Sequence, residues 1–546
     1  MMNISLISGL CCCLLALHLI PTGALADDEL WSARLEIDGR DDVPVAVAVD
    51  SMGGVFVTGA TSDSLTQDDL TVAYDASGGF RWISTDHSDS TCPGAIYTRA
   101  VVMSATGDPI IGGNTTCKAQ KAFVMDLSAT SGAPAWVHRG PNPSFDDPFG
   151  ALVSDQQGGA YLVTDFDLGP WLLEVHRFSP NGTIAWEELI HGPDSIHASA
   201  AAVAGDSTLY IVGTVEWWNI YVAALSSDGD ELWGREFDFA PGKEDERSVA
   251  CATDSAGNLA VLIQTTQWKL TGPDYEVLKL DPQGSVLWYE AYDAAGGADS
   301  AAGIACGVDG SVFVTGRSWG GPATGHDIST VKFGPLGGPP IWVTRVSGVG
   351  DGVDEGRSIV VDDAGYVYVA GSSYQGLSRG SDMLTLRYDP DGGEVWRAFY
   401  VGPAGDDSAM DLDVSSHRVV VAGRSQGAGN LGYDFVTIAY GVFPVAVEEV
   451  AIPSRETSMV VAPNPTTGPT RFHIDLPTEG RTSLRIYDIG GRLVRALLDS
   501  ELPAGGHVVL WEGRDDRGAQ IASGIYFYHL VCDHRTVSKH RIAVIR

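Results

Sequence analysis

The sequence predicts an all-β fold, and three observations support this prediction. Turn-forming residues are abundant, since the 546 residues include 66 glycines. The acidic residues divide into 50 Asp and 20 Glu, and Asp favours turns whereas Glu favours helices. A unit of short apolar strands joined by Asp/Gly turns also recurs along the chain. With 44% hydrophobic residues, the chain has enough apolar side chains for two to four packed domains.

The charge of the chain narrows the classes of partner. The formal net charge is −36, from 34 basic and 70 acidic side chains. Nucleic acids and anionic membranes are bound through basic patches, so we expect neither as a partner. The excess of acid lies before residue 462, because residues 462–546 contain 11 basic and 9 acidic side chains.

The first 26 residues have the pattern of a secretory signal peptide. An apolar run extends from Ile4 to Ile20 and is followed by the small-residue site Ala24-Leu25-Ala26. The run is short for a membrane-spanning helix. We therefore expect residues 1–26 to be removed, so that the mature chain begins at Asp27, leaves the cytoplasm and has no transmembrane anchor.

Five cysteines follow the predicted signal peptide, and an odd number excludes a complete disulfide framework. They are Cys92, Cys117, Cys251, Cys306 and Cys532. Cys92 and Cys117 flank one strand pair and could form a disulfide in an oxidising compartment. The alternative is that both are buried thiols that behave as small apolar side chains.

The recurring unit consists of two β-hairpins. The first hairpin has an alternating apolar strand, an Asp/Gly turn and a β-branched strand that ends in Gly. Its clearest copies are Val45–Ser62, Gly303–Ser318 and Ser358–Ser373. The second hairpin follows downstream, at Leu70–Ser84, Val277–Ala291 and Leu384–Ala398. Four strands per unit predict one blade of a β-propeller.

A tryptophan occupies the last strand of each of the first seven units at a spacing of roughly 50 residues. A regular aromatic residue at one strand position predicts packing between neighbouring blades rather than chemistry. The residues are Trp82, Trp136, Trp186, Trp233, Trp288, Trp342 and Trp396.

The two ends of the array predict how the ring closes. The eighth unit lacks its tryptophan strand, whereas Trp31 lies in a strand without a preceding hairpin. We expect this N-terminal strand to complete the last blade and so to remove free sheet edges. Residues 27–442 would then form eight blades, or seven with one degenerate repeat.

These units resemble bacterial secreted β-propeller repeat families, whose unit reads D-x-x-x-x-x-V-D-x-x-G-x-V-Y-V-x-G and ends D-x-x-G-x-x-x-W. The resemblance covers most of Asp27–Tyr440 and is clearest in the first, sixth and seventh units. It implies a propeller fold and extracellular use, and it implies no particular reaction.

The pattern changes after the repeats. Residues 443–461 read as a linker, and residues 462–546 read as about seven short strands, which predicts a small antiparallel β-sandwich. This segment resembles the C-terminal sorting domain of type IX secreted proteins and the immunoglobulin-like fold of flagellar hook-capping proteins. The residues that carry the resemblance are Pro463, Asn464, Pro465, Gly491, Gly524, Tyr526 and Lys539 within their motifs. The resemblance implies export by the outer-membrane secretion machinery. The alternative is an immunoglobulin-like module that only stabilises or spaces.

Two serine motifs of the form G-x-S-x-G are present, around Ser318 and Ser425. A nucleophile elbow requires a helix after the serine, and both serines instead end the second strand of a unit. We therefore predict no catalytic residues. The Asp389-Pro390-Asp391-Gly392 turn is expected to be held by its own side chains rather than by Ca²⁺.

Acidic residues recur just before the first strand of most units. They are Asp42, Asp147, Asp194, Glu246, Asp299, Asp354 and Asp406. One interpretation is a carboxylate ring at one end of the propeller that suits Ca²⁺ or a cationic ligand. The other is that each carboxylate accepts backbone N–H bonds and holds its own turn. Repetition favours the second interpretation, so we predict no cofactor, with Ca²⁺ as the one ion that such a ring would suit.

Three functional hypotheses follow, and the third is a purely structural component of a surface layer. The first is a non-catalytic binding or adhesion module for a glycan or protein, displayed on the cell surface or released. The second is a secreted propeller enzyme, similar to a polysaccharide lyase or a quinoprotein dehydrogenase, with its active site on loops. The D-x-x-G-x-x-x-W ending loosely resembles the quinoprotein motif, but the repeats have no long insertion. We favour the first hypothesis.

Overall fold

The computed structural model describes most of the chain, and within the described residues every regular element is a β-strand. The described residues are 15–18, 29–37, 40–62, 67–85, 95–116, 121–140, 148–155, 157–167, 171–192, 195–215, 219–239, 246–265, 274–292, 297–349, 352–377, 379–415, 418–427, 432–441, 458–462, 466, 469–476, 480–488, 492–503, 505–532 and 535–544. Over these ranges there is no helix of the length and apolar character that a bilayer crossing requires. The chain divides into two compact units, Met1–Val442 and Phe443–Arg546.

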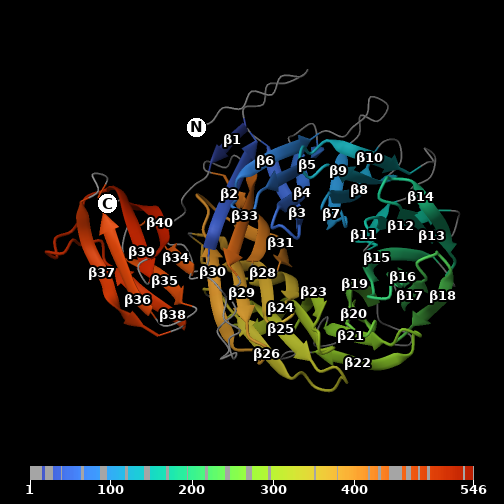
Figure 1. Cartoon of the computed structure of the whole chain (residues 1–546). Helices are drawn as coiled ribbons and strands as arrows, with labels where there is room; N and C mark the ends of the chain where they lie inside the picture. The colour runs from blue at the N-terminus through green and yellow to red at the C-terminus, as the bar shows by residue number, and fades with distance from the viewer. Residues whose placement is uncertain are drawn as a thin grey trace. The chain divides into compact units, whose positions relative to one another are not determined.

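The described residues of the first unit form eight antiparallel sheets, each the blade of a propeller (Figure 1). In seven of them four strands that are consecutive in the chain are also neighbours in the sheet. Blade 1 consists of β3 (Asp41–Val49), β4 (Val55–Ser62), β5 (Gln67–Tyr74) and β6 (Phe80–Thr85), and blade 2 consists of β7 (Ile96–Met103), β8 (Pro109–Thr115), β9 (Lys121–Leu127) and β10 (Pro134–Arg139). Blade 3 consists of β11 (Phe149–Ser154), β12 (Ala160–Asp167), β13 (Trp171–Phe178) and β14 (Ile184–Ile190). Blade 4 consists of β15 (Ile196–Val203), β16 (Leu209–Val215), β17 (Asn219–Leu225) and β18 (Glu231–Phe237).

Blades 5 to 7 repeat this arrangement, and blade 8 takes strands from both ends of the unit. Blade 5 consists of β19 (Glu246–Thr253), β20 (Leu259–Thr265), β21 (Tyr275–Leu280) and β22 (Val286–Tyr292), and blade 6 consists of β23 (Ser300–Cys306), β24 (Val312–Gly321), β25 (Gly325–Phe333) and β26 (Trp342–Val346). Blade 7 consists of β27 (Glu355–Val361), β28 (Val367–Tyr374), β29 (Ser381–Tyr388) and β30 (Glu394–Tyr400). Blade 8 consists of β31 (Asp407–Ser415), β32 (Arg418–Gln426), β33 (Tyr433–Gly441), β2 (Glu29–Ile37) and β1 (Leu15–His18).

The first strands of the blades line the centre of the ring. Each contacts the first strand of the next blade, and β31 contacts β3, so the contacts close on themselves (Figure 1). All eight of these strands carry an irregularity at the same place, for example between Pro44 and Ala46 in β3 and between Ala409 and Asp411 in β31. Such bulges increase the local twist of a strand.

The ring closes through the N-terminal strand β2, which pairs antiparallel with β33 so that Trp31 lies opposite Ala439. The short strand β1, inside the segment predicted as a signal peptide, pairs with the other edge of β2. Because β2 follows the predicted cleavage point, removal of residues 1–26 would leave blade 8 with four strands.

The sequence of each blade explains its turns. We call the turn between the first and second strands the inner turn, and the turn between the third and fourth strands the outer turn. In the outer turn of blade 7, Asp389 Oδ1 accepts the N–H groups of Asp391 at 3.0 Å and of Gly393 at 2.8 Å. Asp50 accepts two N–H groups in the same way in the inner turn of blade 1. These carboxylates add to the backbone hydrogen bonds of the same turns and fix the turns.

The tryptophans of the fourth strands lie between neighbouring blades. Six of these tryptophans donate a hydrogen bond from the indole N–H to a backbone carbonyl, at 2.8–3.2 Å. The carbonyl belongs to the second residue of the outer turn in the next blade. The pairs are Trp82 with Ala129, Trp136 with Pro180, Trp186 with Ser227, Trp233 with Pro282, Trp288 with Pro335 and Trp342 with Pro390.

Trp31 and Trp396, on either side of the closure, are held differently. Trp31 packs on Tyr74, with ring centroids 5.6 Å apart, and on Gly78 of the outer turn of blade 1. The corresponding turn carbonyl, that of Ala76, accepts a hydrogen bond from Arg418 of blade 8. Trp396 packs on Tyr440, with centroids 5.2 Å apart, because β33 and β2 are not joined by an outer turn.

The second unit consists of two antiparallel sheets that share one apolar core. One sheet has the order β34-β35-β38 and the other β37-β36-β39-β40. Trp511 is buried in this core and contacts Tyr526 edge to face at 6.0 Å. The strands are β34 (Ser458–Ala462), β35 (Thr470–Leu476), β36 (Gly480–Tyr487), β37 (Leu493–Leu502), β38 (Gly505–Trp511), β39 (Gly524–Cys532) and β40 (Arg535–Val544).

Candidate functional site

Three carboxylates of the expected ring, Asp42, Asp299 and Asp354, are buried and accept backbone N–H groups. Asp354 accepts the N–H of Gly348 at 2.6 Å and of Tyr374 at 2.7 Å, so it links the end of one blade to the next. Asp42 accepts the N–H of Ile37 at 2.9 Å, and Asp299 accepts that of Trp319 at 2.9 Å. Glu246 is also fully buried. Among the residues that the structure describes, no group of three His, Cys, Asp or Glu side chains is placed to hold a metal ion.

The remaining members of the proposed ring differ from this pattern. Asp147 and Asp194 lie outside the described residues. In blade 8 the buried position belongs to Asp407, which accepts the N–H of Gly402. Asp406 is exposed and accepts the N–H of Ser381 at 2.8 Å. The sequence spacing placed the acid of blade 8 one residue too early, because only the pairing of β31 shows which side chain points inward.

The two serines of the G-x-S-x-G motifs are buried acceptors for arginine. Ser318 lies in β24 and accepts a hydrogen bond from Arg345, which also pairs with Asp327. Ser425 lies in β32 and accepts a hydrogen bond from Arg34 at 2.8 Å. Both motifs are therefore parts of strands, and the serine hydroxyls hold the arginine of the outermost strand.

The structure instead forms a pocket between blades 5 and 6, with a volume of about 390 Å³. Its walls are the inner turn of blade 5, β22, and the inner and outer turns of blade 6. The lining residues are Asp254, Ser255, Ala256, Asn258, Lys279, Leu287, Trp288, Val308, Asp309, Gly310, Pro335 and Leu336.

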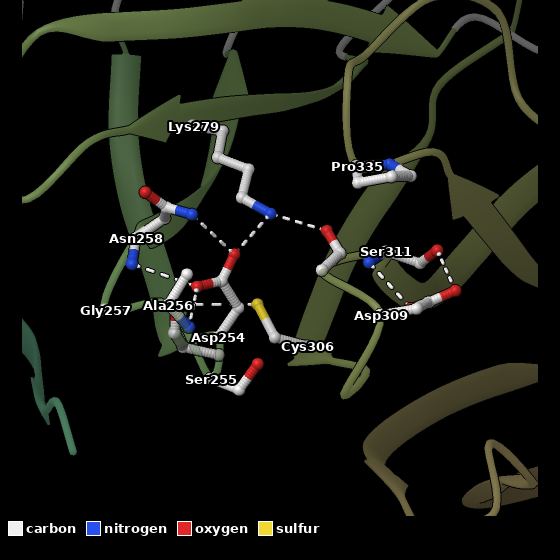
Figure 2. A network of polar contacts seen from close by, with 12 residues as sticks. Asp254, Ser255, Ala256, Gly257, Asn258, Lys279, Cys306, Asp309, Ser311 and Pro335 are labelled. Carbon is white, nitrogen blue, oxygen red and sulfur yellow. Dashed lines mark hydrogen bonds and ion pairs between the residues drawn. The ribbon is translucent and has the colours of Figure 1, made fainter.

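A buried ion pair forms the polar floor of this pocket. Lys279 Nζ lies 2.8 Å from Asp254 Oδ2, and the two side chains are 1% and 2% exposed. Lys279 also donates to the carbonyl of Gly310 in blade 6 at 2.5 Å (Figure 2). Burial alone would raise the pKa of Asp254, but hydrogen bonds from Lys279 and Asn258 outweigh it and hold that pKa below its usual value. The Asp254 carboxylate is therefore ionised at neutral pH.

The direction of the Lys279 side chain leaves this pocket open, since Lys332, at the same position in blade 6, does reach the next outer turn and donates to Pro390 at 3.1 Å. Each third strand places one residue opposite the tryptophan of the fourth, and in blade 3 that residue is Arg177, opposite Trp186. Arg177 bonds Asp155 of its own inner turn at 3.1 and 3.2 Å and also donates to Ser227 of the next outer turn at 2.8 Å. Lys279 reaches Asp254 but ends at the inner turn of blade 6, and the space toward the outer turn at Pro335 forms the pocket.

The rim of the pocket exposes apolar side chains. Leu336 is 91% exposed, Val308 58% and Leu287 48%. They lie on two turns and a strand that are fixed by hydrogen bonds, such as Gly310 N–H to the carbonyl of Gly307 at 2.9 Å and Trp288 to Pro335 at 3.1 Å. Exposed apolar residues around a polar floor are typical of ligand and protein binding sites.

Two of the predicted cysteines lie in first strands near this pocket. Cys306 Sγ donates to the carbonyl of Ala252 at 3.7 Å (Figure 2), and Cys251 lies in β19. Both are free thiols. Burial raises the pKa of each thiol to about 12, so both stay protonated and unreactive at neutral pH. Cys532 is a buried free thiol of the second unit, whereas Cys92 and Cys117 lie outside the described residues.

The residues of the C-terminal motifs are distributed over the second unit. Gly524 and Tyr526 lie in β39, where the hydroxyl of Tyr526 donates to the carbonyl of Ala522 at 3.0 Å. Lys539 lies in β40 opposite His529. Pro463, Asn464, Pro465 and Gly491 lie outside the described residues.

The repeat pattern of the sequence did not predict this pocket. The available signal was the residue opposite each tryptophan, which varies between blades while the surrounding pattern repeats. In chain order these residues are Ala73, Asp126, Arg177, Ala224, Lys279, Lys332, Arg387 and Ala439. In a repeat protein, a site that is specific to one repeat arises where the residue type at a given position differs from that in the other repeats.

Comparison with known proteins agrees with the fold. The β-propeller repeat family matches residues 341–377, which include the outermost strand of blade 6 and the first hairpin of blade 7. A search of curated protein sequences finds no match.

Similar solved structures include three from different organisms. Sqt1 of Chaetomium thermophilum, bound to the N-terminus of ribosomal protein L10, is 13% identical over 74% of this chain and 98% of its own, with a TM-score of 0.48. Quinohemoprotein alcohol dehydrogenase of Comamonas testosteroni is 12% identical over 78% and 76%, with a TM-score of 0.42. PorZ, a surface component of the type IX secretion system of Porphyromonas gingivalis, is 15% identical over 94% and 74%, with a TM-score of 0.30. The repeat match and the sheet topology together confirm the predicted all-β propeller.

Proposed function

We propose that this chain is an exported, non-catalytic binding protein whose propeller presents the pocket between blades 5 and 6 to a ligand. The observation that carries the proposal is the pocket itself, with three exposed apolar side chains around a buried Lys279–Asp254 pair. The turns that form it are held by hydrogen bonds to their own residues and to the neighbouring blade. Binding to a site formed in advance loses little conformational entropy.

The proposal assigns delivery to the other parts of the chain. Residues 1–26 would direct export across the inner membrane, and an immunoglobulin-like domain at residues 462–546 would act as the type IX sorting domain. The ordered C-terminal motifs and the near balance of 11 basic and 9 acidic side chains in this segment support this division. An eight-bladed propeller of residues 27–442 would be the passenger.

The pocket is tested by filling it without breaking its ion pair. Lys279→Arg places in blade 5 the residue that spans the equivalent space in blade 3. We expect the wild-type chain to bind at least one member of an array of glycans and peptides saturably, and Lys279→Arg to lose that ligand while its melting temperature is retained. Arg177→Lys is the matched control and should leave binding unchanged. A chain that binds no member, or a ligand that Lys279→Arg still binds, would contradict the proposal.

A further inference from the structure

We propose that the ligand of this pocket is a polypeptide segment that inserts a lysine or arginine side chain with apolar neighbours. This inference rests on the proposed function and names the chemistry of the ligand. The charges of the pocket, its hydrogen-bonding groups and its rim support this ligand.

The lining residues carry one net negative charge. Asp254 and Lys279 neutralise each other in the floor. Asp309, the third charged residue of the lining, is exposed on the inner turn of blade 6. Burial would raise the pKa of Asp309, but hydrogen bonds from Ser311 and the nearby Lys332 lower it, so the carboxylate is ionised at neutral pH. Lys332 offsets part of the Asp309 charge, and the lining residues themselves still favour a cation over an anion.

The hydrogen-bonding groups of the pocket favour a donor. Lys279 directs its ammonium to Asp254 and Gly310, within the floor and the wall. Ser255 donates its hydroxyl to the carbonyl of Val308 at 3.1 Å. The carbonyl of Pro335 accepts one hydrogen bond, from Trp288, and a carbonyl can accept two. Ammonium and guanidinium groups are donors without acceptors, and they match this arrangement.

The rim matches the rest of such a side chain. Lysine and arginine pack their methylene stems on apolar surfaces while their charged ends reach polar groups. Leu287, Val308 and Leu336 provide this surface, and Leu336 extends far enough into solvent to contact apolar neighbours of the inserted residue. The excess of acid in residues 1–461, 61 acidic against 23 basic side chains, attracts cationic segments at long range.

The test is a calorimetric titration of the full chain with acetyl-Gly-Leu-Arg-Leu-Gly-amide and three relatives. In these relatives the central residue is lysine, citrulline or glutamate. We expect saturable binding of the arginine and lysine peptides, binding at least about tenfold weaker for neutral citrulline, and none for glutamate. Equal affinity for arginine and citrulline, or no saturable binding of either basic peptide, would overturn the inference.

Three variants localise the effect. Lys279→Arg should abolish binding by filling the pocket. Asp309→Asn should weaken it about fivefold to tenfold, whereas Asp391→Asn, which removes one charge from the exposed outer turn of blade 7, should not change it. Equal effects of the two Asp variants would show non-specific attraction and contradict the inference. The glycan and peptide array separates this inference from the proposed function. If the wild-type chain binds a neutral glycan on the array and Lys279→Arg does not, the proposed function stands and the inference of a basic peptide ligand is wrong.

Discussion

The guanidinium of Arg34 donates from Nε to the carboxylate of Asp434 at 2.7 Å, although 400 residues separate them in the chain. Their side chains are 7% and 3% exposed. Arg34 lies in β2 and Asp434 in β33, and Arg34 also donates to Ser425 in β32 at 2.8 Å. This pair therefore joins the two ends of the propeller inside blade 8.

Loss of this ion pair should open the ring. Arg34→Ala leaves the buried Asp434 carboxylate without its cation, and we expect a loss of about 3–5 kcal/mol in the free energy of unfolding of the propeller. Arg345→Ala is the control, because Arg345 makes the equivalent contacts to Asp327 and Ser318 within the continuous hairpins of blade 6 and is more exposed. Urea unfolding measures both. An Arg34→Ala chain at least as stable as Arg345→Ala would mean that β2 is held mainly by its backbone pairing.

Substitution of Gly78 should destabilise the propeller, because this glycine lies against the Trp31 ring. Gly78 has φ +81°, and a Cβ there would lie 2.6 Å from the Trp31 ring. Gly107 has φ +85° with open space around it. We expect Gly107→Ala to cost about 1–2 kcal/mol through backbone strain alone, and Gly78→Ala to cost more because the indole must move. Thermal unfolding of the two variants compares them, and equal losses would show that the Trp31 contact adds nothing.

Buried carboxylates should make the propeller more stable in mild acid. Burial raises the pKa of Asp42 and Asp126 from 3.8 to about 7 and that of Asp407 to about 6. Between about pH 4 and pH 7 the native chain then holds more protons than the unfolded chain, so the free energy of unfolding falls as the pH rises. We expect the melting temperature to be a few degrees lower at pH 8 than at pH 5. Asp42→Asn should reduce this difference, and the exposed Asp391→Asn should not. A rise in melting temperature between pH 5 and pH 8 would contradict the prediction.

The acidic residues before the first strands should stabilise the propeller without bound Ca²⁺. Both oxygens of Asp354 already accept backbone N–H groups, so Asp354→Ala removes two charge-assisted hydrogen bonds and should cost about 2–4 kcal/mol. Adding CaCl₂ should leave the melting temperature of the wild-type chain unchanged, because an ion that does not bind the native state cannot stabilise it. A saturable calcium isotherm that Asp354→Ala abolishes would establish the carboxylate ring instead.

Residues 462–546 should direct secretion of the chain. Removal of residues 462–546 should leave a folded propeller that stays in the periplasm of its native host. Fusion of the same residues to an unrelated reporter directed to the periplasm should move that reporter to the surface or the medium in a host with type IX secretion. Cell fractionation measures both. Normal surface delivery of the truncated chain would refute the sorting role and leave a spacer domain.

The sequence by itself determined the repeated parts of this protein. Strand alternation, Asp/Gly turns and the period of the tryptophans are local signals, since each depends on residues within one unit. They predicted the hairpins, the position of Trp288 in the fourth strand of its blade and the absence of a nucleophile elbow at Ser318. The unpaired strand around Trp31 indicated even the closure, because a repeat with a missing strand has to obtain it elsewhere.

Only the tertiary structure decided what differs between blades. The inward position of Asp407 depends on the pairing of β31, and the bond from Arg418 to Ala76 joins residues 342 positions apart. The pocket depends on the direction of one side chain, because Lys279 ends at Gly310 whereas Arg177 and Lys332 cross to the next outer turn. Such features arise between surfaces of separate blades, and their geometry is set by packing in space rather than by the local pattern of residues.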